Sequence, residues 1–177
     1  VHNGYLYFNS YYSRKIARYN LSTKKCETVV STGSYPHAFQ IQNNILYSLD
    51  RSNIKVRNLS TNTNISCSFT GDLRSYGRYS YAMTVDQSGN NMYLKRSSRT
   101  YQFVIDANTK CPSTTVGSQF IDGVGSTSYG MVAHPTDDSI IYYSNYYSHR
   151  IEKVTLNTNK NGVASRVTKG GCCRGGT

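Results

Sequence analysis

One stretch of sequence occurs twice in this chain, first as Tyr11-Tyr12-Ser13-Arg14-Lys15-Ile16 and again as Tyr146-Tyr147-Ser148-His149-Arg150-Ile151. The similarity continues at the same offset of 135 residues, since Leu21-Ser22-Thr23 corresponds to Leu156-Asn157-Thr158. This offset equals about three repeats of roughly 45 residues, a length found in known repeat architectures. A repeat therefore decides the architecture and restricts every later claim about function.

Each repeat is expected to contain four short strands. The second strand of every unit carries an equivalent tyrosine, at Tyr7, Tyr47, Tyr93 and Tyr142. The first strands are expected at residues 38–41, 82–85 and 131–133, and the second strands at 45–49, 91–94 and 140–144. The third strands are expected at 16–21, 54–59, 101–105 and 151–156. The fourth strands are expected at 28–30, 65–69, 114–116 and 165–167. Asn, Asp and Gly fill the turns after the first strands, as turn geometry favours. Four short strands per unit, without helical periodicity, predict an all-β fold, a β-propeller.

The fourth unit resembles an NHL-type repeat and is nearly as similar to the YWTD-type repeat of receptor propellers. The resemblance rests on Tyr142-Tyr143-Ser144-Asn145, then Arg150-Ile151 and Lys153, and on the start of the unit at residues 129–135. It covers essentially the whole chain and implies propeller blades, but several propeller families with different functions share the motif. The third unit departs from it with Lys95-Arg96-Ser97-Ser98, where an acidic turn residue is usual. A generic antiparallel β-sandwich is the alternative.

The repeats predict a single domain over residues 1–177. Its blades are expected at approximately 1–35, 36–80, 81–128 and 129–169, followed by a linker of Gly and Cys at 170–177. Alignment of the first two units places Val1 opposite Ile41, so the first blade lacks most of its inner strand. We therefore expect about four blades of a larger propeller, six-bladed or so. A four-bladed ring that closes on itself is the alternative.

Composition points to an extracellular β protein. Only 16% of the residues are charged, there are 17 Tyr and no Trp, and no apolar run approaches the ~18 residues of a membrane span. Three glycosylation sequons begin at Asn20, Asn58 and Asn64. The first two fall at the same repeat position, the end of the third strand, where a glycan has room. We expect a secreted glycoprotein modified at Asn20 and Asn58, with Asn64 competing with its neighbour.

The five cysteines also fall into a pattern. Cys26, Cys67 and Cys111 are expected to open the fourth strands of the first three blades, and Cys172 and Cys173 lie next to each other. The Cα atoms at equivalent positions on neighbouring rims are expected to lie farther apart than the ~4.4–6.8 Å that a disulfide needs. The cysteines would then pair outside this chain, between molecules, or stay buried and unpaired. No paired Cys-x-x-Cys supports a metal site.

The net charge of +11 raises the possibility of a polyanionic partner, such as an acidic or sulfated glycan, a nucleic acid or a cell surface. No run of five basic residues occurs, so a solvated rim is the alternative for any single group. The secretory features disfavour nucleic acid, although tyrosines beside arginines can stack on bases. The polyanion candidates are Lys95, Arg96, Arg99, Arg14, Lys15 and Arg18.

Catalysis finds little support in the sequence, and no cofactor, metal or catalytic residue is expected. Propeller lactonases and amidating lyases resemble this repeat and carry metal-binding acids and histidines around their axial channel. Here Asp86 and His134 occupy equivalent positions after the first strand, with Asp50 and Asp122 in other loops. Turn formation explains these residues more simply. His37 aligns with Tyr81 and Tyr129 at the entrance to the first strand, which makes it a candidate pocket residue.

Two tyrosine pairs complete the list of candidate functional residues. They are expected in turns between the second and third strands, where exposed aromatic rings suit sugars or a neighbouring subunit. These residues are Tyr11, Tyr12, Tyr146 and Tyr147. The leading interpretation is a non-catalytic extracellular interaction or structural module, with protein partners or self-assembly as in a fibre, appendage or matrix. A lectin-like or polyanion-binding module and a fragment of a propeller hydrolase or lyase are the alternatives.

Overall fold

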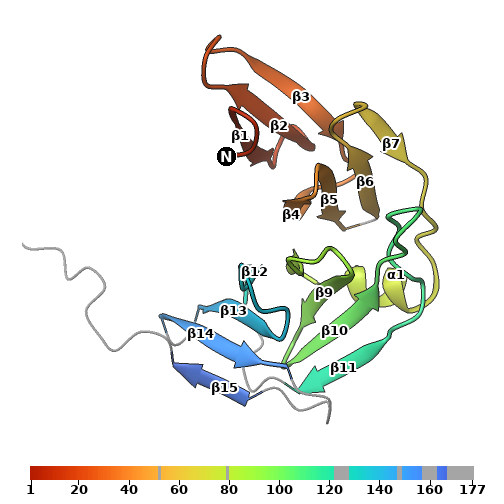
Figure 1. The fold of residues 1–177 in the computed structure, drawn as a ribbon, viewed down its shortest axis with the longest axis vertical. Helices are drawn as coiled ribbons and strands as arrows, with labels where there is room; N and C mark the ends of the chain where they lie inside the picture. Colours follow the sequence, from red (N-terminus) through yellow and green to blue (C-terminus); the bar gives the residue numbers. More distant parts are fainter. Residues whose placement is uncertain (52, 79, 122–127, 147–148, 157–162, 167–177) are drawn as a thin grey trace, which may run out of the picture.

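The computed structural model describes residues 1–51, 53–78, 80–121, 128–146, 149–156 and 163–166. In these residues the strands form four small antiparallel sheets that fan around a common axis, with the first strands innermost and the last strands on the rim (Figure 1). The innermost strands of neighbouring sheets contact one another. This is a β-propeller-like arrangement, and the prediction of an all-β propeller is confirmed.

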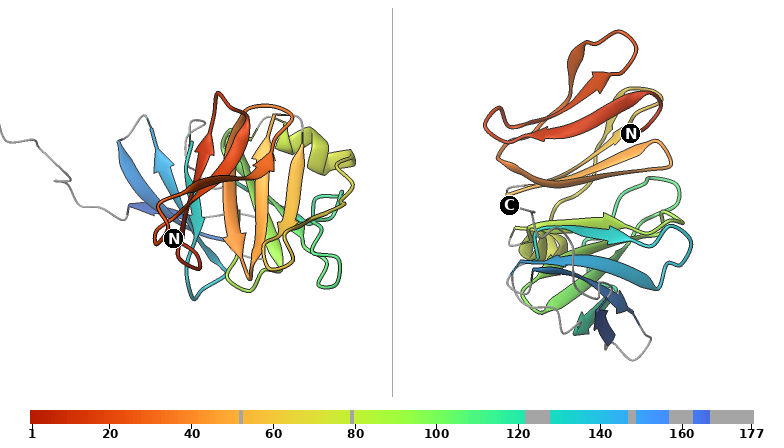
Figure 2. Two further views of the ribbon diagram at one scale, coloured as in Figure 1. Left: turned by 90° about the horizontal axis from the view of Figure 1, so that it is seen from above. Right: turned by 90° about the vertical axis from the view of Figure 1, so that its left-hand side faces the viewer.

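Three of the sheets have four strands and the first has three. The first sheet contains β1 (Tyr5–Ser10), β2 (Lys15–Asn20) and β3 (Cys26–Ser31). The second contains β4 (Pro36–Gln42), β5 (Ile45–Asp50), β6 (Ile54–Asn58) and β7 (Thr63–Ile65). The third contains β8 (Ala82–Val85), β9 (Asn91–Arg96), β10 (Arg99–Val104) and β11 (Ser118–Ile121). The fourth contains β12 (Met131–Ala133), β13 (Ile140–Asn145), β14 (Arg150–Thr155) and β15 (Val163–Arg166). Figure 2 shows these sheets as successive twisted layers.

Tight turns set the register between the strands. Asn43 and Asn44 join β4 to β5 with φ of 49° and 60°, the left-handed region that two-residue hairpin turns require. Asn3 and Gly4 make the same kind of turn, with φ of 48° and 77°, between the bridged residues His2 and Tyr5. Asn and Gly tolerate this conformation, so the local sequence fixes these hairpins.

The predicted fourth strands are partly wrong, and one helix was not predicted. Residues 114–116 do not form a strand, because the rim strand of the third sheet is β11. In the second sheet β7 ends at Ile65, and the chain then enters helix α1 (Gly71–Gly77). This helix packs its buried Leu73 and its Tyr76 against the third sheet, where Tyr76 stacks on Tyr101 with ring centroids 3.9 Å apart. Tertiary contacts stabilise a helix that is too short to be stable alone.

The repeated tyrosine fills the space between successive sheets. Tyr47 packs with Met83 and Met92 of the third sheet, and Tyr93 packs with Ile141 and other residues of the fourth sheet. Burial raises the pKa of Tyr47 to about 12, with a smaller contribution from the negative charge of Asp86. Burial also raises the pKa of Tyr93, again with Asp86 contributing. Both phenols therefore stay neutral within the core at physiological pH.

Hydrogen bonds join the innermost strands. The Gln40 side chain of β4 accepts hydrogen bonds from the Thr84 hydroxyl (2.5 Å) and the Val85 N–H (3.1 Å) of β8, and donates to the Val85 carbonyl (2.9 Å). Thr84 Oγ1 in turn accepts a hydrogen bond from the Ala133 N–H of β12 at 2.9 Å. This chain of contacts fixes three innermost strands around the axis and thereby positions whatever lies at their ends.

The first and fourth sheets each present an open apolar face. Leu6 is 45% exposed, although its register equivalents Leu46, Met92 and Ile141 in the other sheets are completely buried. On the far side of the fourth sheet, Val132 is 53% exposed, whereas Thr84 at the equivalent position is buried against the fourth sheet. These faces match those that pack between neighbouring sheets, so the described residues form part of a propeller ring.

A disulfide joins Cys67 to Cys111, with their Cα atoms 5.5 Å apart, so the expectation that these rim cysteines are too distant is wrong. Neither residue opens a rim strand. Cys67 follows β7 in the segment that leads to α1, and Cys111 lies between β10 and β11. The two irregular segments meet at the rim, where the Leu73 N–H donates to the Thr114 carbonyl at 3.0 Å. Cys26 is unpaired and exposed, whereas Cys172, Cys173 and the linker 170–177 lie outside the described residues.

Candidate ligand-binding site

The propeller has two ends with different side chains. The entry end, as we call it, is the end at which β4, β8 and β12 begin. Because the strands are antiparallel, the turns between the second and third strands also lie there; Pro36 pairs with Asp50, for example. The turns between the first and second strands, and between the third and fourth strands, lie at the opposite end. The sequence therefore places alternate turns of each blade on opposite sides of the molecule.

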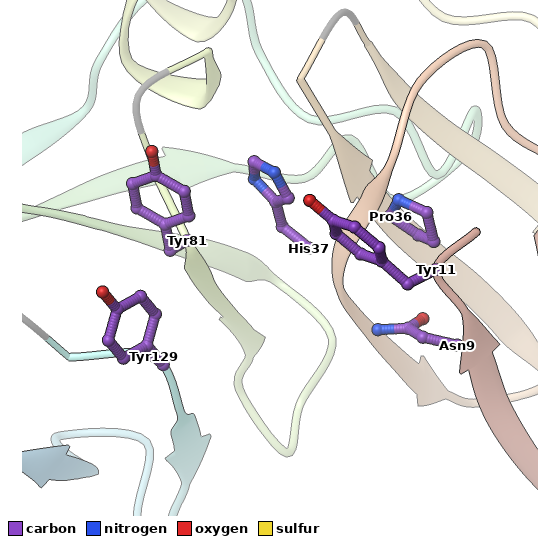
Figure 3. Close-up of a pocket in the computed structure, with 6 residues that line it drawn as sticks. All are labelled: Asn9, Tyr11, Pro36, His37, Tyr81 and Tyr129. Atoms are coloured by element: carbon purple, nitrogen blue, oxygen red, sulfur yellow. The ribbon is translucent and has the colours of Figure 1, made fainter. Parts of the chain in front are cut away.

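Aromatic rings from all four sheets gather at the entry end, most of them at or next to the start of the innermost strands. His37 stacks on Tyr81 with ring centroids 4.8 Å apart, and Tyr81 meets Tyr129 edge-on at 5.9 Å. Tyr129 contacts Tyr146 edge-on at 6.1 Å. Tyr11 of the first sheet faces the same space (Figure 3). We call the set Tyr11, His37, Tyr81, Tyr129 and Tyr146 the aromatic arc.

Two adjoining hollows lie along the aromatic arc. The first has a volume of about 390 Å³ and is lined by Asn9, Tyr11, Pro36, His37, Tyr81 and Tyr129. The second has a volume of about 470 Å³ and is lined by Tyr129, Ser144, Asn145, Tyr146, His149, Arg150 and Ile151. Tyr129 belongs to both. The tyrosines are substantially exposed, at 44% for Tyr81, 57% for Tyr129 and 61% for Tyr146. Part of each ring is therefore accessible to a ligand.

Local contacts hold the arc in place. The Gly130 N–H donates to Ser144 Oγ at 2.9 Å, and a Cβ at Gly130 would lie 3.0 Å from that oxygen, so glycine permits this close approach beside Tyr129. The His37 Nδ1 atom lies 3.3 Å from the Ser80 carbonyl oxygen. Tyr11 stacks on Tyr35 with centroids 4.5 Å apart. Rings supported in this way lose little conformational entropy when a ligand binds.

Three of the four predicted contact tyrosines belong to this site or lie beside it. Tyr11 and Tyr146 belong to the arc, and Tyr12 is 91% exposed beside it, with its ring edge-on to that of Tyr11. Tyr147 lies outside the described residues. The sequence reasoning named His37 as a pocket residue but did not include Tyr81 and Tyr129. Their alignment with His37 was the signal, because equivalent positions of successive blades face the same axis.

Four of the six polyanion candidates lie at the entry end. Arg14 and Lys15 lie where the turn between β1 and β2 leads into β2. Arg96 and Arg99 flank the turn between β9 and β10. Arg14 also lies over the ring of Tyr35, 5.1 Å from its centroid. The other two candidates are placed differently. Lys95 is 2% exposed with its Nζ over the Tyr143 ring, and Arg18 lies within β2, where its Nε donates to Glu27 at 2.6 Å.

Asp86 and Asp50, two of the acidic residues considered for a metal site, serve turns. Asp86 is buried at the opposite end, and its carboxylate accepts hydrogen bonds from the Asn90 and Asn91 N–H groups at 2.8 and 3.1 Å. His134 holds the equivalent position after β12, and its Nδ1 accepts from the Thr136 N–H at 3.2 Å. At the entry end, Asp50 Oδ1 accepts from the Asn53 N–H at 2.7 Å, and Asp122 lies outside the described residues. In the part of the chain that the structure describes, no three His, Cys, Asp or Glu side chains form a potential metal site.

The predicted glycosylation sites lie at the opposite end from the aromatic arc. Asn20 Oδ1 accepts hydrogen bonds from the Ser22 and Thr23 N–H groups, and Asn58 Oδ1 accepts from those of Ser60 and Thr61. A glycan would attach to the Nδ2 atom, so these turns are compatible with modification. Asn64 is exposed and accepts a hydrogen bond from Arg57. No helix among the described residues has the length and apolar character needed to cross a membrane.

The fold and the site together define a β-propeller-like protein with an aromatic hollow at one end of its axis. Neither a family model nor a curated protein sequence matches the chain. Solved structures do match. An auxiliary nutrient binding protein from Bacteroides thetaiotaomicron superposes with a TM-score of 0.64 and 11% identity, over 95% of this chain and 40% of that one.

Two further solved structures show the same likeness. A functionally unknown protein from Desulfotomaculum acetoxidans superposes with a TM-score of 0.62 and 14% identity, over 92% of this chain and 52% of that one. The β-propeller domain of Cps50 (Swd1) from Myceliophteria thermophila gives a TM-score of 0.51 and 10% identity, over 74% and 38%. The chain thus spans about half or less of each structure. At these identities the likeness shows the fold alone, and it agrees with a partial propeller.

Proposed function

We propose that this chain is a non-catalytic binding module and that the aromatic arc holds its ligand. The observation that supports this proposal is the gathering of exposed rings from different sheets around two adjoining hollows. Rigid tyrosine rings offer a large contact area at low entropy cost, and their faces stack on flat or apolar ligand faces. The nutrient-binding role named for the Bacteroides protein is in keeping with a propeller that binds a small ligand.

The repeat type, the location and the wider assembly belong to the same proposal. The blades are NHL-type repeats, and further blades complete the ring beside the open faces of the first and fourth sheets. The whole protein functions outside the cell, which the Cys67–Cys111 disulfide supports because such bonds persist in oxidising compartments. The chain has no catalytic residues of its own and works through contacts with its ligand and partners.

Substitution of the central rings tests the arc. Tyr81→Ala and Tyr129→Ala are each expected to weaken binding about tenfold to hundredfold, since loss of one aromatic stacking contact costs roughly 1–3 kcal/mol. The probes are an array of oligosaccharides and a set of single-stranded oligonucleotides, first screened with the unmodified chain. Tyr12→Ala is the matched control, because it removes an exposed tyrosine that lines neither hollow. Undiminished binding in both arc variants would refute the proposal, as would turnover of a bound probe.

A second candidate function is assembly into a fibre or matrix, and the exposure of Tyr12 favours it. A ring that is 91% exposed contributes little to the fold and is available to a neighbouring subunit. The Tyr12→Ala variant separates the two functions. If assembly is the function, this variant loses self-association in sedimentation while Tyr81→Ala and Tyr129→Ala keep it.

Glycosylation tests the extracellular location. The natural protein is expected to lose mass when N-glycans are removed enzymatically, because Asn20 and Asn58 occupy accessible turns away from the arc. Ser22→Ala and Ser60→Ala should each abolish one glycan yet keep the Asn side chain that accepts the turn hydrogen bonds. Intact-mass analysis makes the comparison. An unchanged mass for the protein from its natural source would contradict both the glycans and this support for secretion.

A further inference from the structure

The entry end carries a concentration of positive charge around the aromatic arc. Every turn between the second and third strands that the structure describes contributes a basic residue: Arg14 and Lys15, Arg51, Arg96 and Arg99, and Arg150. Arg150 lines the second hollow together with His149, and His37 lines the first. These groups come from all four sheets, so the positive charge lies at the same end of the molecule as the aromatic rings.

Few carboxylates lie at the entry end, and those that the structure describes there are buried and hydrogen-bonded. Asp50 is one of them, and it accepts a hydrogen bond from the Asn53 N–H at 2.7 Å. Among the described residues that line the two hollows, none is Asp or Glu. Glu152, near the second hollow, is buried and accepts hydrogen bonds from Arg150 and Asn145. Asp86, Asp106, Asp137 and Asp138 occupy turns at the opposite end. The separation gives the entry end a positive potential that attracts anions.

We propose that the ligand of the aromatic arc is an acidic polysaccharide, a chain of sugar rings that carry carboxylate or sulfate groups. This inference rests on the binding function proposed above. The apolar faces of successive sugar rings would stack on tyrosines of the arc, while the surrounding arginines neutralise the acidic groups. The two hollows adjoin and share Tyr129, which suits an extended chain better than a single compact molecule.

Single-stranded nucleic acid combines flat rings with negative charge in a similar way, but another feature favours sugar. The Cys67–Cys111 disulfide indicates an oxidising compartment, and polysaccharides are the abundant polyanions outside cells. The sequons at Asn20 and Asn58 point to the same environment, and glycans there would lie at the end opposite the arc. They would leave the aromatic surface free for a long ligand.

The test uses polygalacturonate and its fully methyl-esterified form, which have the same backbone and differ in charge. We expect polygalacturonate to bind at least tenfold more tightly at low salt, and its affinity to fall steeply with added salt. The double variant Arg14→Gln, Arg99→Gln should reduce this preference severalfold. Arg150 is left unchanged because its Nε holds the buried Glu152. The double variant Lys25→Gln, Lys110→Gln removes the same charge at the opposite end and should change neither affinity.

Each other outcome has a defined meaning. Equal binding of the two polymers would overturn the acidic-ligand inference and leave the binding function intact, as would binding of only neutral oligosaccharides from the array. Polygalacturonate binding that survives Tyr81→Ala and Tyr129→Ala would place the polyanion on another surface and also overturn the inference. Tighter, arc-dependent binding of an oligothymidylate would replace polysaccharide with nucleic acid. Failure of every probe would count against both the inference and the proposed function.

Discussion

Removal of the Cys67–Cys111 disulfide is expected to lower the free energy of unfolding by about 4 kcal/mol. The bond closes a loop with a sequence separation of 44 residues, and cross-linking a loop of that length reduces the entropy of the unfolded chain by this amount in the loop-closure model. The bond also ties the segment before α1 to the third sheet, where Leu73 of the helix enters the core. Loss of the disulfide therefore affects the contact between the second and third sheets directly.

Urea unfolding of the Cys67→Ala, Cys111→Ala double variant makes the measurement, with the unmodified chain under oxidising conditions as the reference. Cys26→Ala is the matched control, because Cys26 is exposed and unpaired; its effect should stay within about 0.5 kcal/mol. The slope of the unfolding free energy against urea should rise in the double variant, because a chain without the cross-link exposes more surface when it unfolds. A loss below about 1 kcal/mol would show that the bond contributes little to stability.

Local patterns in the sequence were sufficient to predict the blades. Asn3-Gly4 and Asn43-Asn44 specify hairpins by themselves, and the repeated tyrosine marks the second strand of every unit. Segments that depend on tertiary contacts were missed. The helix α1 has seven residues and no usable periodicity, and it forms because Leu73 and Tyr76 pack on a neighbouring sheet. The disulfide joins two irregular segments, so reasoning from regular strand register gave the wrong distance.

In the candidate site, too, the sequence predicted what depends on the repeat and missed what depends on tertiary packing. Repeat alignment was enough to place His37 beside Tyr81 and Tyr129 at equivalent positions, but the contacts between their rings depend on how the blades pack. Lys95 illustrates the opposite error. It belongs to a cluster of basic residues in the sequence, yet β9 continues to Arg96 and directs Lys95 between the third and fourth sheets. A cluster of basic residues in the sequence therefore does not show which of its members is exposed, because burial depends on the packing of neighbouring sheets.

The turn after β8 provides the other large expected effect. Asp86→Ala should lower the free energy of unfolding by about 3 kcal/mol, because the carboxylate is buried and accepts hydrogen bonds from the Asn90 N–H, the Asn91 N–H and the Asn91 side chain. Hydrogen bonds to a charged group contribute roughly 1.5–3 kcal/mol each, and buried donors that lose their acceptor are costly. Asp86→Asn keeps an acceptor oxygen in the same place and should lose less.

Asp137→Ala is the matched control, since Asp137 serves the corresponding turn of the fourth blade. Its carboxylate is exposed and accepts from the backbone N–H and hydroxyl of Ser139, interactions that also lower the pKa of Asp137. Water replaces such contacts readily, so the control should lose much less stability than Asp86→Ala. Urea unfolding of the three variants, with and without zinc or calcium, separates a turn from a metal ligand. If Asp86→Ala lowers the free energy of unfolding no more than the control does, the buried Asp86 contributes no more to stability than the exposed Asp137. In the structure, turn donors already occupy both carboxylate oxygens of Asp86. If a metal ion stabilised the unmodified chain and Asp86→Ala abolished that effect, Asp86 would instead be a metal ligand.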